Sequence, residues 1–188
     1  MIKRISDFFY QLSSVGVTLT ALLIFVLFSV LVLPGQTALA EEISRGTGSP
    51  DTSIIYRPSD LYRMAEAYGE QGRQAYIHAR WSFDVGFPLV YAFFLVTSIS
   101  WLAGHALSPG NLWRRANVLP LVAALFDFLE NAATSLVMAR YPARTLLVDI
   151  LAPLFTLLKW VCVLGSFVLL VAGAFAVLWV FIRRARGR

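Results

Sequence analysis

The sequence predicts an all-α integral membrane protein, a bundle of four transmembrane helices with an amphipathic extracytoplasmic surface helix between the first and second spans. Hydrophobic residues make up 58% of the 188 residues, against roughly 45–50% in soluble domains. Four apolar runs are each long enough to cross a hydrocarbon core about 30 Å thick, which takes about 20 helical residues. We therefore expect residues 1–188 to form a single membrane domain with lipids around it.

The first apolar run covers residues 14–33 and is followed by the sequence PGQTALAEE. A basic start, an apolar stretch and Ala38-Leu39-Ala40 before Glu41 are typical of a signal peptide cleaved after Ala40. The apolar stretch is longer than the ~7–15 residues of a signal peptide, which favours a retained span. Cleavage of residues 1–40 stays open as the alternative, and it would leave three spans.

Residues 34–80 are predicted to form an extracytoplasmic segment with two parts. Residues 41–55 are rich in Gly, Ser, Thr and Pro and are interpreted as an irregular linker. From Pro58 onward, apolar residues recur at spacings of three and four, which predicts an amphipathic helix capped by Ser59 or Asp60. Its tyrosines suit an anchor at the membrane interface. The alternative is a lid over a pocket, hinged at Gly69 and Gly72.

The remaining spans are predicted at residues 82–104, 117–138 and 150–182. Basic residues gather at Lys3-Arg4, Arg114-Arg115 and the arginines of residues 183–188. Because basic residues concentrate on the cytoplasmic side, both termini are expected there, in a bacterial inner membrane. No nucleic-acid motif accompanies these charges, so nucleic acid is not an expected partner.

Charged residues inside the predicted spans are the candidate functional residues. At about 1.5 Å per residue from Asn117, Asp127 lies about 15 Å and Glu130 about 20 Å into the membrane. Charges in lipid are costly, so they normally face protein or a wet cavity. Spacing within each helix predicts that three helix faces converge on one polar pocket open to the outside. Its candidate residues are Asp84, Asp127, Glu130, Asn131, Lys159, Arg73, Arg80 and Tyr91.

Two interpretations of this pocket stay open. The residues could only hold the helices in register through ion pairs and hydrogen bonds. However, three acids within the spans face the single lysine, Lys159. At least one carboxyl is therefore expected to be protonated, paired with an arginine or available to a ligand.

Several kinds of chemistry have no support in the sequence. Cys162 is the only cysteine, which excludes an internal disulfide and a cysteine metal cluster. Hydrolase, zinc-protease and phosphate-loop motifs do not occur in the sequence. No metal and no cofactor are expected.

Four short motifs resemble those of a group of uncharacterised bacterial four-span membrane proteins. They are G-R-x-x-Y at residues 72–76, D-x-x-x-P-x-x-Y at 84–91, D-x-x-E-N at 127–131 and K-W at 159–160. The resemblance covers about residues 58–162 and implies that these positions matter to the family. It implies no known activity.

Three functions are compatible with these observations. We favour a protein that binds or transports a cation, a proton or a small amphiphile, because the pocket has surplus acids but no complete catalytic group. A second hypothesis is a membrane enzyme that acts on a lipid or isoprenoid, with Asp127 or Glu130 as general acid and base. A third is a structural subunit or assembly factor. A homo-oligomer or a membrane-protein partner stays open in each case.

Overall fold

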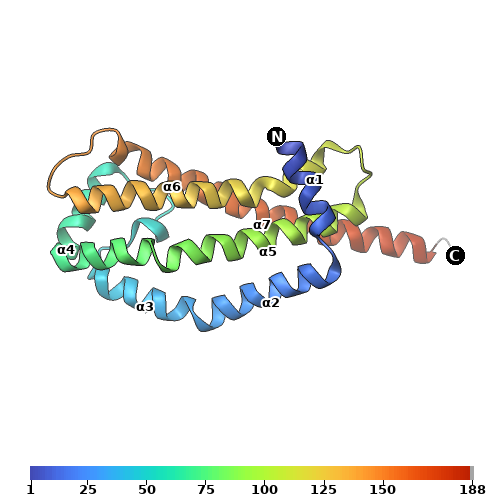
Figure 1. Ribbon diagram of the computed structural model, residues 1–188, viewed down its shortest axis with the longest axis horizontal. Helices are drawn as coiled ribbons and strands as arrows, with labels where there is room; N and C mark the ends of the chain where they lie inside the picture. The colour runs from blue at the N-terminus through green and yellow to red at the C-terminus, as the bar shows by residue number, and fades with distance from the viewer. Residues whose placement is uncertain (187–188) are drawn as a thin grey trace.

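The computed structural model describes residues 1–186 and shows an all-helical chain, with no strand among those residues. Gly187 and Arg188 of the predicted basic tail lie outside the described residues. Three helices, α5 (Phe83–Ala106), α6 (Leu119–Arg140) and α7 (Val148–Arg186), lie side by side (Figure 1). Each belongs to a helical stretch long and apolar enough to cross a membrane. The protein is therefore a helical membrane protein with three to four candidate spans.

The first predicted span corresponds to α2 (Val15–Leu31), which packs against α5. Ser14 caps α2, since its side chain accepts a hydrogen bond from the Val17 N–H at 3.2 Å. A bend of 96° separates α2 from α1 (Ile2–Leu12), and only the two helices together are long and apolar enough to cross a membrane. This bend is why the number of candidate spans is three or four.

The segment after α2 differs from the prediction. Residues 41–55 were expected to be irregular, but α3 (Leu33–Ser44) includes the first four of them. Arg45 ends α3 in the left-handed conformation, and Gly46 and Gly48 follow with positive φ angles. These turns bring the short helix η1 (Pro50–Thr52) back toward α7. The linker is thus a packed loop, which we call the η1 loop (residues 45–57).

The predicted helix beginning near Pro58 is α4 (Pro58–Arg80), which covers one end of the bundle (Figure 1). Its cap differs from the prediction: Arg57 occupies the cap position, and the Asp60 carboxylate accepts a hydrogen bond from the Arg57 N–H at 2.9 Å. Gly69 interrupts the helix with φ 66° and ψ −179°, angles that essentially only glycine adopts. Gly72, the second predicted hinge, is helical and packs against Tyr68.

The apolar side of α4 packs against protein. Leu61, Met64, Ala65 and Tyr68 are buried in a cluster with residues of α6 and α7. The tyrosines expected at a membrane interface are also buried. Three of the four hydroxyls bond within the protein, as Tyr62 does with Thr145 at 3.1 Å, and the Tyr76 hydroxyl has no partner within residues 1–186. The end of the bundle covered by α4 and the η1 loop is called the α4 end below.

The opposite end carries α1 and η2 (Leu112–Val118), which contact each other and α5. It is called the α1 end below. The basic residues Lys3, Arg4, Arg114 and Arg115 all lie there. In Figure 1 the last turns of α7 extend past this end.

Candidate functional site

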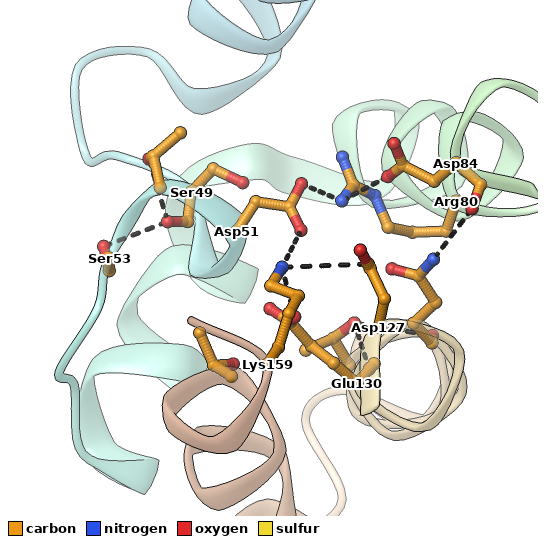
Figure 2. A network of polar contacts seen from close by, with 12 residues as sticks. Ser49, Asp51, Ser53, Arg80, Asp84, Asp127, Glu130 and Lys159 are labelled. Atoms are coloured by element: carbon orange, nitrogen blue, oxygen red, sulfur yellow. Dashed lines mark hydrogen bonds and ion pairs between the residues drawn. The ribbon is translucent and has the colours of Figure 1, made fainter. Parts of the chain in front are cut away.

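Six charged side chains from five elements meet at the α4 end of the bundle (Figure 2). Four are acids and two are bases. They are Asp51 of η1, Arg80 of α4, Asp84 of α5, Asp127 and Glu130 of α6, and Lys159 of α7. We call these six residues the charge cluster.

Lys159 connects three of the acids. Its Nζ lies 2.5 Å from Glu130 Oε2, 3.4 Å from Asp51 Oδ1 and 3.8 Å from Asp127 Oδ1. Glu130 is fully buried and Lys159 is 6% exposed. A buried ion of either sign needs such partners, because desolvation costs several kcal/mol per ion. The two α6 acids face α7 together because they are three residues apart.

Arg80 is the second base of the charge cluster, and it forms ion pairs with Asp51 and Asp84. Arg80 ends α4, while Asp84 lies in the first turn of α5. Trp81 and Ser82 lie between the two helices. The four-residue spacing nevertheless brings the Arg80 and Asp84 side chains together.

Two uncharged candidates also lie at the charge cluster. The Tyr91 hydroxyl donates a hydrogen bond to Asp127 Oδ2 at 3.1 Å. The Asn131 amide donates to the backbone carbonyl of Asp84 at 3.3 Å. Seven of the eight predicted pocket residues thus lie together in the structure.

Arg73 is the exception, and its predicted place in the pocket is wrong. Its Nη1 donates to the Ala65 carbonyl at 3.0 Å, and its guanidinium lies 4.8 Å from the centre of the Tyr141 ring. The kink at Gly69 lies between Arg73 and Ala65. Arg73 therefore folds back onto the turn before the kink and does not extend toward Asp84.

Asp51 is the charged residue that the sequence analysis missed. Its carboxylate lies between Arg80 and Lys159 (Figure 2), and its backbone carbonyl accepts a hydrogen bond from the Trp160 indole at 3.1 Å. Periodicity could not have placed it, because the η1 loop has no helical repeat. The sequence offered one signal for Asp51: it is an acid next to Pro50 in the only long polar segment.

The η1 loop is held at this site by further polar contacts. Tyr56 shares a hydrogen bond with Thr156 at 3.1 Å, and Tyr68 donates to the Gly48 carbonyl at 2.7 Å. Burial raises the pKa of Tyr56 above its ordinary value, so its hydroxyl keeps its proton. These contacts fix the position of the η1 loop at the site.

A cavity of about 700 Å³ opens beside the charge cluster. One part of its wall is charged, formed by residues that include Asp51, Arg80 and Lys159. The other part is mostly apolar and runs between α2–α3 and α7 over one side of α5. Its apolar lining includes Phe25, Leu33, Phe83, Phe87, Val163 and Phe167.

The charge cluster has more acids than bases. Its four carboxyls face two bases, so it would carry a charge of −2 with every group ionised. Glu130 Oε1 and Asn131 Oδ1 are buried and have no hydrogen-bond partner. Within residues 1–186, no three His, Cys, Asp or Glu side chains are grouped to hold a metal ion.

The chain matches no protein-family model, no curated protein sequence and no solved structure.

Proposed function

We propose that this membrane protein binds a small amphiphile in the cavity at the α4 end. The observation that carries the proposal is the two-part wall of the cavity, with charges at one end and aromatic and aliphatic side chains along the other. Ligand sites are typically concave, mostly apolar and supplied with a few placed polar groups. An amphiphile has the matching division into a polar head and an apolar tail.

The route for such a ligand lies between α2–α3 and α7. Both contact α5, and Phe25 of α2 and Phe167 of α7 line the same cavity. A tail would lie against these rings while the head meets Lys159 and its neighbours. An amphiphile dissolved in the surrounding lipid could enter sideways without leaving an apolar environment.

We further propose four spans, α2, α5, α6 and α7, in a bacterial inner membrane with both termini cytoplasmic. The basic residues of α1 and η2 lie at one end of the bundle, and Arg183, Arg184 and Arg186 end α7. This distribution supports a cytoplasmic α1 end. The cavity would then face outward, with α4 as an extracytoplasmic cover. We also propose that the chain belongs to the group of four-span membrane proteins that its four motifs resemble. Asp84, Tyr91 and Asp127 come from two of these motifs and lie at one site.

Two tryptophan substitutions on α7 test the binding proposal. Val163 lines the cavity, whereas Val168 is 68% exposed and lies outside it. Val163→Trp should weaken binding of radiolabelled dodecyl glucoside at least about tenfold, which is about 1.4 kcal/mol. Val168→Trp adds the same side chain and should leave affinity unchanged. Equal affinities in both variants, or no binding by the wild type, would contradict the proposal.

Transport of a proton or small cation is a second candidate, supported by the surplus of carboxyls in the charge cluster. Proteoliposomes with wild type, Asp127→Asn or Glu130→Gln would be compared for flux of protons and of monovalent cations. We expect flux in the wild type and its loss in both variants. Absence of flux in the wild type, or unchanged flux in the variants, rules out this candidate.

A further inference from the structure

We infer that the amphiphile bound in the cavity is cationic, with an organic ammonium head at the charge cluster and its tail between α2 and α7. This inference rests on the proposed function and adds the charge of the head group.

The charges facing the cavity favour a cation. Its lining contains the carboxylates of Glu41, Asp51, Asp84 and Asp127, but only the two bases Arg80 and Lys159. Both bases already pair with acids of the protein. An anionic head would have to displace a carboxylate from Arg80 or Lys159. A cationic head would instead offset the surplus negative charge.

Four buried polar atoms of the cavity lining have no hydrogen-bond partner among the described residues: Ser49 Oγ, the Tyr76 hydroxyl, Arg80 Nε and Asp84 Oδ2. The two hydroxyls and the Asp84 oxygen can accept a hydrogen bond, whereas Arg80 Nε can only donate one. A buried polar group without a partner costs about 1–3 kcal/mol, so added donors satisfy more of these atoms than added acceptors do. A protonated amine supplies donors and positive charge together.

The aromatic wall provides a second source of attraction for an ammonium group. Rings of Tyr68, Tyr76, Phe87, Tyr91 and Trp160 line the cavity. Ring faces attract cations, most strongly where water is excluded. The protein already uses this contact in the cavity wall. The Arg80 guanidinium lies 4.8 Å from the Tyr76 ring centre, and Lys159 Nζ lies 5.6 Å from that of Trp160.

A metal ion fits this site less well than an organic cation. A hard cation takes six or more oxygen ligands at short distances, and the described part of the chain offers no group of three acids so placed. An inorganic ion would also leave the apolar wall without a partner. The long cavity and its rings match a head with a hydrocarbon tail.

The test compares three probes that share a dodecyl tail: dodecyltrimethylammonium, dodecyl glucoside and dodecyl phosphate. The full-length protein is held in nanodiscs of an uncharged glycolipid, so that the lipid surface does not concentrate a charged probe. We expect dodecyltrimethylammonium to bind at least about tenfold more tightly than either other probe, a difference of about 1.4 kcal/mol. A neutral or anionic probe that binds as tightly overturns the cationic head but leaves amphiphile binding in place. Failure of all three probes to bind overturns both.

Two matched variants assign the preference to the charge cluster. Asp127→Asn keeps the side-chain size and should remove most of the tenfold preference for the cationic probe. The free energy of unfolding in detergent, compared with that of the wild type, shows that the variant is folded. Glu66→Gln removes an exposed carboxylate from α4 and should preserve the preference. An unchanged preference in Asp127→Asn, or an equal loss in Glu66→Gln, overturns the inference.

Discussion

The two ends of the bundle bury polar groups in different ways. At the α4 end, six charged side chains pair with one another around Lys159 and Arg80. At the α1 end the buried contacts are neutral, since the Asn117 amide donates to the Ser6 carbonyl at 3.2 Å and to Ser100 Oγ at 2.8 Å. Both arrangements join segments that are distant in the sequence.

The difference shows which polar contacts are enough to hold helices together. At the α1 end, two hydrogen bonds of Asn117 and the contacts between Tyr10 and Arg114 join η2, α5 and α1. Neutral bonds of this kind avoid the desolvation cost of buried ions. The six charges at the α4 end exceed that requirement, and their acids outnumber their bases. The excess supports a ligand-binding role at the α4 end and a structural role at the α1 end.

The largest expected effect comes from Lys159→Met. Without Nζ, the buried Glu130 and Asp127 lose their shared counter-ion. Breaking a buried ion pair typically costs about 3–5 kcal/mol, and we expect that loss in the free energy of unfolding in detergent. The double variant Lys159→Met/Glu130→Leu should recover part of it, because one unpaired charge is removed. A single variant as stable as the wild type would show that the charges at the α4 end are not energetically coupled.

Tyr91→Phe removes one hydroxyl from the α4 end without changing the ring. That hydroxyl donates to the Asp127 carboxylate, and a hydrogen bond to a charged group contributes about 1.5–3 kcal/mol. We expect an unfolding free energy lower by that amount, measured by reversible unfolding in mixed detergents. Phe93→Leu, a change on an exposed ring of the same helix, serves as the control. An equal loss in both variants would assign the effect to packing.

Gly69→Ala tests whether the stability of the α4 end depends on the kink in α4. The conformation of Gly69, φ 66° and ψ −179°, costs other residues about 1–3 kcal/mol. The substitution should therefore lower stability and increase proteolysis within residues 58–80. Gly110 lies in a loop at the α1 end, with open space where a Cβ would be and no positive φ. Gly110→Ala should change neither quantity, and a similar loss there would remove the conformational explanation.

The length of the apolar runs predicted α2, α5, α6 and α7, and helical spacing predicted α4 and most of the candidate site. Helical spacing alone places Asp127, Glu130 and Asn131 on one face of α6, and the cost of burying their charge predicts a partner such as Lys159. The predicted apolar runs match α2, α5, α6 and α7, and most of the predicted ends lie within a few residues of the ends in the structure. These features depend on residues that are close together in the sequence, so they can be predicted from the sequence alone.

The features that sequence reasoning missed depend on loops and on a break in a helix. Asp51 reaches the charge cluster through turns at Arg45, Gly46 and Gly48, which no periodic pattern describes. Arg73 was placed wrongly because the break at Gly69 redirects it to Ala65. Burial of the α4 tyrosines was also missed, since a ring suited to a membrane interface is equally suited to a protein interior with hydrogen-bond partners.

Tyr10→Phe gives the smallest expected effect and is the counterpart of Tyr91→Phe at the α1 end. The Tyr10 hydroxyl donates to the Arg114 carbonyl at 2.9 Å, and the Arg114 guanidinium lies 4.0 Å from the ring centre. Phenylalanine keeps the ring contact and loses only a neutral hydrogen bond, which contributes about 0.5–1.5 kcal/mol. Amide exchange in residues 2–12 should therefore rise modestly, while binding of an alkyl ammonium probe at the α4 end should not change. A loss of stability as large as that of Tyr91→Phe would mean that charge does not distinguish the two ends, and weaker probe binding would mean that they are coupled.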